Sequence, residues 1–232
     1  MKKSLLFIVM AVLLAGCGSA PQKPSEPIKK VAVVGITIDP ASILDYGIKD
    51  EKDTIPGLIS ATFDDVVQMT ESKLSGIVAL SPISGFVGSQ NYQGLGQKID
   101  DDRKLAVTVG GKSMVYFSKE EDDVEDGLLT SEVAKKLCAD LQVDAVVLVY
   151  SEWSAKVDRF VPLGRASVEN RVTVWGRNGN KVFEEQVQVS GDDVIGTGAL
   201  VALNAGTMKK DWTVAYGKSL DEVIVKLKTV LN

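Results

Sequence analysis

The sequence predicts an α/β domain, in the α+β sense, in which helices pack against a mixed sheet that contains a long antiparallel hairpin. Two runs rich in apolar and β-branched residues, at 31–38 and 143–157, are typical of strands buried on both faces. Amphipathic segments with helical spacing stand between and after these runs, which favours helices packed on a sheet. The pair Asn178-Gly179 separates two further β-type segments and predicts a tight hairpin turn.

The amino-terminal half begins with the strand expected at 31–38 and continues, after a polar segment, with a helix. Apolar side chains recur at helical spacing from about 56 to 75, Pro56 stands in the first turn, and Gly76 is the expected end. A short strand is expected at 77–80. The next residues, up to about 104, are rich in glycine and predict a loop.

The middle of the chain predicts a small hairpin followed by a helix. Two strands, LAVTV at 105–109 and SMVYF at 113–117, are expected on either side of a glycine turn. An acidic segment at 118–128 then leads into a helix expected at about 130–141. The buried strand at 143–157 follows directly.

The carboxyl-terminal third contains the long hairpin, with valine-rich segments at 165–176 and 181–190. The glycine-rich segment at 190–206 predicts a loop that enters a short helix. The chain ends with an apolar stripe at helical spacing. Ser219 and Glu222 fit a capping box, so the last helix is expected to begin near residue 219.

The first residues have the pattern of an export signal. Lys2 and Lys3 precede eleven apolar residues, Leu5 to Ala15. A membrane-spanning helix needs roughly 20 apolar residues, whereas about 7–15 suit the apolar region of a signal peptide. The stretch Leu14-Ala15-Gly16-Cys17 resembles the lipobox of bacterial lipoproteins, in which the cysteine is acylated and becomes the new amino terminus.

This resemblance implies cleavage between Gly16 and Cys17, with lipid attachment through acyl chains such as palmitate on Cys17. The alternative is a free cysteine near an ordinary cleavage site. We expect a signal peptide at 1–16, a lipidated tether at 17–30 and a single α/β domain at 31–232. Because Gly18 rather than aspartate follows the cysteine, the enteric sorting pattern points to the outer membrane, facing the periplasm, if the source is Gram-negative.

Composition excludes several classes of function. Removal of Lys2 and Lys3 with the signal leaves 24 basic and 31 acidic side chains, a formal charge of −7. An acidic domain argues against nucleic acid and against electrostatic docking on anionic lipid, so membrane attachment is expected from the acyl chains on Cys17. The chain has no histidine, which excludes Ser-His-Asp and Cys-His catalysis and imidazole-dependent zinc sites.

Cys138 is the second and last cysteine of the chain, so no intramolecular disulfide is expected once Cys17 carries lipid. It lies on the apolar side of the helix expected at 130–141. This position favours a small buried hydrophobe over a reactive thiol or an intermolecular bridge.

None of the short motifs in the sequence is complete enough to predict a ligand-binding site. VGGKS at 109–113 resembles the end of a phosphate-binding loop, but that motif needs a glycine where this chain has Ala106. The glycine pairs at 94–96 and 196–198 are too short for a dinucleotide fingerprint. Acidic runs at 100–102 and 120–126 lack EF-hand spacing and predict a solvated surface. We therefore assign no catalytic residue, no cofactor and no metal site.

The segments VAVVGI, VAKKLCADLQVDAVVLVYSEW and VTVWGRNGNKVFEEQV, with the lipobox and the final helix, resemble a group of bacterial envelope lipoproteins. Their α/β domain is similar to the N-terminal domain of TolB and to the periplasmic domain of the curli secretion lipoprotein CsgG. The resemblance covers about residues 31–231. It implies a non-enzymatic role in envelope assembly or protein binding, with a protein partner or a homo-oligomer.

Two other functions stay open at this point. A small-molecule-binding or carboxylate-dependent hydrolytic domain would need acids gathered from distant segments, such as Asp39, Asp158 and Asp192. A subunit of a secretion complex would need membrane-inserting segments, and the sequence has no clear pair of long alternating segments for that purpose.

Overall fold

The structure is a computed structural model that describes residues 23–24, 26–40, 43, 54–100, 103–157, 163–197, 200–201 and 203–231. The expected signal peptide at 1–16, with Gly16, lies outside the described residues, and so do Cys17 and Asp158.

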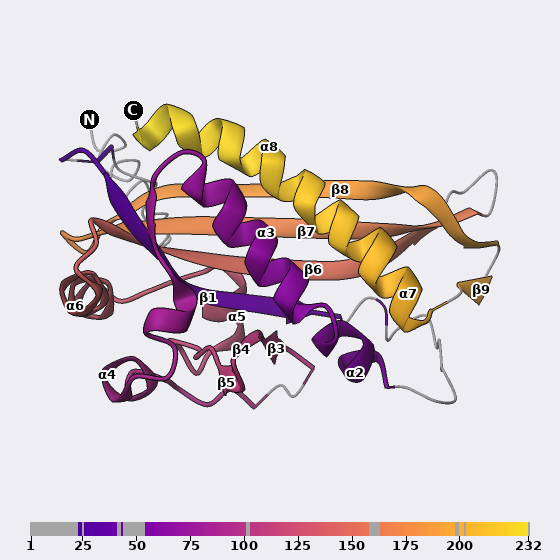
Figure 1. Ribbon diagram of the computed structural model, residues 1–232, viewed down its shortest axis with the longest axis horizontal. Helices are drawn as coiled ribbons and strands as arrows, with labels where there is room; N and C mark the ends of the chain where they lie inside the picture. The colour runs from indigo at the N-terminus through magenta and orange to yellow at the C-terminus, as the bar shows by residue number, and fades with distance from the viewer. Residues whose placement is uncertain are drawn as a thin grey trace, which may run out of the picture.

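A mixed sheet organises the fold (Figure 1), and it confirms the predicted fold class with its long antiparallel hairpin. Its strands lie in the order β2-β1-β6-β7-β8-β9, and β3 also pairs with β1. β1 is parallel to β2 and to β6, whereas the pairs β6–β7, β7–β8 and β8–β9 are antiparallel. The strands of this sheet are β1 (Lys30–Asp39), β2 (Ala79–Ser81), β3 (Leu105–Ala106), β6 (Ala145–Val157), β7 (Leu163–Gly176), β8 (Lys181–Thr197) and β9 (Leu200–Val201).

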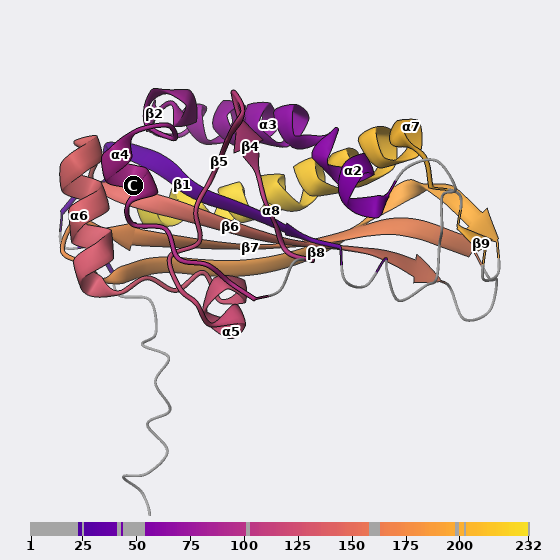
Figure 2. The same ribbon diagram turned by 90° about the horizontal axis from the view of Figure 1, so that it is seen from below.

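Helices cover both faces of the sheet. α3 (Phe63–Ser75) and α8 (Thr213–Leu231) lie on one face, and α5 (Glu121–Glu125) lies on the other (Figures 1 and 2). α6 (Ser131–Leu141) stands at the end of the sheet, next to the turn between β7 and β8. The remaining helical segments are α2 (Ile55–Ser60), the 3₁₀ turn η2 (Ile83–Gly85), α4 (Gln90–Gln93), α7 (Ala205–Thr207) and the π-helical turn η3 (Met208–Trp212).

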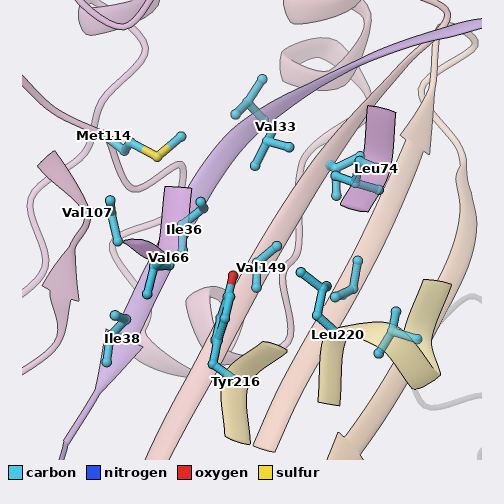
Figure 3. Close-up of a cluster of buried hydrophobic side chains, with 14 of the residues drawn as sticks. Val33, Ile36, Ile38, Val66, Leu74, Val107, Met114, Val149, Tyr216 and Leu220 are labelled. Carbon is cyan, nitrogen blue, oxygen red and sulfur yellow. The ribbon is translucent and has the colours of Figure 1, made fainter. Parts of the chain in front are cut away.

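The main core lies between the sheet and the pair α3 and α8. Figure 3 shows Tyr216 and Leu220 of α8 beside Val149 of β6, and all three side chains are buried. β1 is buried on both faces from Val31 to its end, as its continuous apolar run predicted. Each large apolar side chain that becomes fully buried contributes about 1.5–3 kcal/mol, so this core is the main source of stability.

The helix expected at 56–75 is two helices, which corrects that prediction. α2 ends at Ser60 and α3 begins at Phe63. The hydroxyl of Ser60 donates to the carbonyl oxygen of Pro56, and that of buried Thr62 donates to Ile59, both at 2.7 Å. Hydroxyl groups that bond to nearby carbonyl oxygens compete with a continuous helix and bend it at this point.

Two predictions for residues 105–128 need correction. The glycine turn joins β4 (Thr108–Val109) to β5 (Lys112–Ser113), so the strand expected at 113–117 ends at Ser113. Beyond it, only an isolated bridge between Gln97 and Tyr116 continues the pairing. The acidic segment contains α5, a helix that has no apolar stripe and whose last residue contacts the buried Lys104.

The glycine-rich segment at 190–206 is also different from the prediction. β8 continues through it to Thr197, because β7 is long enough to pair with it as far as Leu163. α8 begins at Thr213 rather than near residue 219, so the predicted capping box is wrong. Ser219 lies inside the helix and is fully buried, and its hydroxyl has a tertiary partner instead of capping a helix end.

Candidate functional site

The two edges of the sheet differ in length. β2, at one edge, has three residues, whereas β8 has 17. β9 pairs with β8 only at Gly196 and Thr197. Within the described part of the chain, the outer side of β8 from Lys181 to Ile195 therefore has no strand partner, and we call this stretch the β8 edge. Unpaired N–H and C=O groups along a long edge form a template for another strand.

The hairpin fixes which residues of the β8 edge point outward. The N–H of Arg177 donates to the carbonyl oxygen of Asp144 at 2.9 Å, so every second residue of β7 counted back from 177 faces β6. The intervening residues face β8, and Asn170, for example, pairs with Val187. The residues of β8 that alternate with Val187 thus direct their backbone N–H and C=O away from β7; they are Glu184, Gln186, Gln188 and Ser190.

α8 runs beside this edge and is joined to β8 by polar contacts. Ser219 donates its hydroxyl hydrogen to the carbonyl oxygen of Val187 at 2.7 Å, near the middle of both elements. Lys226 pairs with Glu185 at 2.7 Å between Nζ and Oε1. These contacts place α8 over one face of β8. The outward N–H and C=O groups of β8 remain in the plane of the sheet.

Exposed apolar side chains gather on the same two elements. Among the described residues, the large apolar side chains that are exposed are Val194 of β8 and Val214 and Val225 of α8, at 45%, 47% and 69%. Val214 and Val225 are eleven residues apart, which is about three helical turns, so they lie on one stripe of α8. Each lies far from the buried stripe that covers the sheet.

A cluster of buried polar side chains lies at the carboxyl end of β1. The buried carboxylate of Asp39 accepts a hydrogen bond of 2.5 Å from the hydroxyl of Tyr150. The ammonium group of Lys104, also buried, lies 3.6 Å from Asp39 and 3.0 Å from Glu125. Burial and the adjacent Asp39 raise the pKa of Tyr150 well above its usual range, so this phenol stays protonated.

The carboxylates proposed for a hydrolytic site are not brought together by this cluster. Asp39 is bound by Tyr150 and Lys104, whereas Asp192, on β8, pairs with Lys218 of α8. Asp158 lies outside the described residues. A hollow of about 520 Å³ between α3 and the segment 97–116 has no carboxylate in its described lining. Asp39 does meet two other acids, because Glu121 and Glu125 lie 3.7 and 3.0 Å from the same Lys104 ammonium group, but Asp192 is not among them.

Cys138 is buried in α6, as the sequence predicted. Its thiol lies 3.9 Å from the carbonyl oxygen of Trp175. Burial raises the pKa of this thiol to about 11, which keeps it protonated and unreactive at neutral pH.

The chain enters the domain at a fixed point next to the turn between β7 and β8. The carboxylate of Asp144 accepts hydrogen bonds from the backbone N–H groups of Lys29 and Lys30, at 2.8 and 2.9 Å. Arg177 forms ion pairs with Asp144 and with Glu26. The end of the expected tether is therefore held at one end of the sheet, away from the carboxyl end of β6.

The described residues contain no group of three or more Cys, Asp or Glu side chains placed to hold a metal ion. None of the helices within the described ranges is both long and apolar enough to cross a membrane. The lipid-attachment residues Gly16 and Cys17 lie outside those ranges, so their assignment stays a prediction.

Sequence reasoning did not find the β8 edge. An edge strand and an interior antiparallel strand have the same alternation of side chains, so nothing in residues 181–195 says which one they form. Val225 is an apolar residue on the otherwise polar side of the last helix. This exception is visible in the sequence, and it is the signal that could have drawn attention to this surface.

The fold overlaps two solved structures at low sequence identity. The hypothetical protein CT253 from Chlamydia trachomatis is 11% identical, with a TM-score of 0.47, over 88% of this chain and 98% of that one. Lipoprotein GNA1162 from Neisseria meningitidis is 10% identical, with a TM-score of 0.41, over 87% of this chain and 99% of that one. No protein-family model matches the sequence, and no curated protein matches it.

Proposed function

We propose that this protein is a bacterial lipoprotein, anchored by acyl chains on Cys17, whose α/β domain binds a polypeptide partner and performs no catalysis. In this proposal the anchor lies in the outer membrane and the domain faces the periplasm. The role is one in envelope assembly, as the resemblance to the domains of TolB and CsgG implies.

The observation that carries the binding role is the β8 edge. An open strand edge binds an extended segment by main-chain hydrogen bonds, and side chains on alternate positions supply the specificity. The opposite edge of the sheet is blunted, because β2 has three residues and β1 beyond it is paired with β3. In the described chain, the polypeptide-binding template is therefore confined to β8.

The mutual contacts of the buried polar groups in the described residues support a role without catalysis. The buried ionisable groups Asp39, Lys104 and Tyr150 satisfy one another, and the thiol of Cys138 is buried and protonated. Such a cluster stabilises the connection between β1 and the segment that contains Lys104, and it needs no substrate to be satisfied.

The position of the tether supports anchoring with the β8 edge accessible. The tether joins the sheet beside Asp144, and β6 then extends for 13 residues away from that point. At about 3.3 Å per residue the far end of β6 is roughly 40 Å from the junction. The β8 edge runs along this length, so it is reachable by another protein beside the membrane.

Photo-cross-linking in the intact envelope tests the proposal. A photoreactive residue at Gln188, on the β8 edge, is expected to capture a polypeptide in cells that produce the lipidated protein. The same residue at exposed Ala79, on the β2 edge, is the matched control and is expected to capture much less. Equal capture at both positions, or none at Gln188, would overturn the binding role of β8.

A further inference from the structure

The two faces of the sheet beside the β8 edge differ in charge. From this difference we propose that the polypeptide bound at the edge is an extended cationic segment, in which lysine or arginine alternates with apolar residues. Its cationic side chains lie on the face that carries α5, and its apolar side chains lie on the face that carries α8. The inference rests on the proposed function and names the chemistry of the partner.

Side chains along β8 alternate between these two faces. Gln186 projects on the α5 face, where its amide donates a hydrogen bond to Glu169, and Gln188 projects on the same face. Val187, between them, is buried on the α8 face, beneath Ser219. Neighbouring strands share their faces, so an added strand places every second residue on the α5 face and the others on the α8 face.

The α5 face carries carboxylates in line with Gln188. In the register of the sheet, Glu152 of β6 is opposite Glu169 of β7, and Glu169 is opposite Gln188. The next position in this row belongs to the added strand, roughly 10 Å or two strand spacings from Glu169, within reach of a long cationic side chain. Among the described residues, no lysine or arginine pairs with Glu169. Four residues further along β6 and β7, Lys156 and Arg165 mark the end of this acidic stretch.

α5 extends the acidic character toward the edge. The segment 120–126 contains six acidic side chains and no basic one. The guanidinium group of Arg171 donates to the carboxylate of Asp126, at the end of α5, and to Oε1 of Gln186 at 2.9 Å. The half-exposed carboxylate of Asp126 therefore lies one side chain away from the β8 edge.

The α8 face of the edge already has cations of its own. Lys226 of α8 pairs with Glu185 at 2.7 Å, and Lys218 pairs with Asp192, so two ammonium groups reach over β8 on this side. A cationic side chain of the partner would meet them. Val189, which packs against the core on this face, offers an apolar surface instead. The partner residues on this side are therefore apolar.

A second copy of this chain does not fit the same chemistry. Two β8 edges that pair antiparallel about an axis perpendicular to the sheet would put both acidic faces on the same side of the joined sheet. Like charges close together on paired strands are destabilising. A segment of opposite charge is attracted to the acidic face, and its charge also suppresses binding of acidic competitors.

Synthetic peptides test the charge and the alternation. One fluorescent peptide alternates lysine with valine, a second alternates glutamate with valine, and a third has the lysines and valines of the first sorted into two blocks. The lipidated full chain in nonionic detergent is expected to bind the first peptide about ten-fold more tightly than either of the others, as measured by anisotropy. Added salt is expected to reduce this preference. Equal binding of the first two peptides, equal binding of the first and third, or no binding of any peptide would overturn the inference.

A neutral substitution on the acidic face locates the charge contact. Glu169→Gln removes the charge and keeps an oxygen that accepts the hydrogen bond from Gln186. It is expected to weaken binding of the alternating lysine peptide several-fold. Asp64→Asn makes the same change of charge at an exposed position of α3, on the other face of the sheet, and is expected to leave binding unchanged. Equal effects of the two substitutions would overturn the role of the α5 face.

A proline substitution locates the backbone contact. Gln188→Pro removes an outward N–H that the fold itself does not use, a position at which edge strands accept proline. Gln188→Ala removes the same side chain and keeps the N–H, so it is the matched control. We expect the proline variant to lose peptide binding and the alanine variant to keep it, with melting temperatures showing that both are folded. Binding by a folded Gln188→Pro protein would overturn pairing at this edge.

The outcomes also separate this inference from the proposed function. Capture of a polypeptide at Gln188 in the envelope, without a preference for the alternating lysine peptide, keeps the binding role and overturns the cationic partner. Capture of a second copy of the chain at Gln188 does the same. No capture at Gln188 overturns the binding role and this inference with it.

Discussion

Ser219, in the middle of α8, donates its hydroxyl hydrogen to the carbonyl oxygen of Val187 in β8 at 2.7 Å, and both residues are buried. Together with the ion pair between Lys226 and Glu185, this contact places the helix over the strand at the centre of the candidate binding edge. It also explains why a polar residue occupies the buried side of α8, since a hydroxyl in an apolar site needs a partner.

Ser219→Ala is expected to lower the free energy of unfolding by about 1 kcal/mol, the usual contribution of one buried hydrogen bond. Urea unfolding of the unlipidated Cys17→Ser protein measures it. Ser75→Ala is the matched control, because Ser75 is exposed and bonds only to Ser72 of its own helix. A loss no larger than that of the control would mean that the contact adds nothing to stability.

Lys104→Met is expected to be strongly destabilising, by about 3–5 kcal/mol, because it removes the buried ammonium group that pairs with the buried Asp39 carboxylate. Lys136→Met removes an exposed helical ion pair with Asp140 and is expected to change stability by less than about 0.5 kcal/mol. The two variants are compared in the same urea titration. Similar losses for both would contradict a buried charge cluster at the end of β1.

Gly179→Ala is expected to be destabilising for two reasons. Gly179 has a φ of 83°, which side chains rarely adopt, and an added Cβ would lie 2.7 Å from the backbone oxygen of Ser131 in α6. Gly85→Ala, where nothing lies within 4 Å of the added carbon, is the control. Thermal unfolding of both measures the difference, and a wild-type melting temperature for Gly179→Ala would show that the turn adapts freely.

Cys138 predicts a specific dependence of stability on pH. Burial raises the pKa of its thiol from an ordinary 9.0 to about 11, so the folded state holds the proton more tightly than the unfolded state. This contribution is fully present below pH 9 and is lost as the pH rises through about 11. Relative to wild type, Cys138→Ala should therefore lose less stability between pH 9 and 11. Parallel curves for the two proteins would contradict the shift.

Cys17→Ser is expected to release the protein from membranes, because a single attachment through acyl chains is the anchor we propose. Fractionation of cells followed by a carbonate wash measures it, with the unchanged chain as the reference. A variant that still sediments with washed membranes would show that lipid on Cys17 is not the anchor.

The sequence was sufficient where one local signal dominates. The continuous β-branched run of β1, the Asn178-Gly179 turn and the apolar stripe of α6 predicted the correct elements, because each has an unambiguous period or turn preference. It was insufficient where long-range pairing decides. Residues 190–197 are rich in glycine and aspartate, yet they extend β8 because β7 offers them a partner.

The sequence predicted the general composition of the protein but not the position of the candidate site. The sequence alone determined the fold class, the lack of histidine, the acidic charge and the expected lipid address at Cys17, since these depend on composition and short spacing. Only the tertiary structure decided that β8 is an edge, that Ser219 is an interior contact rather than a cap, and that Asp39 and Asp192 serve separate ion pairs. The physical reason is that strand order, helix placement and the burial of charge depend on contacts between residues distant in the chain, and local propensity does not encode them.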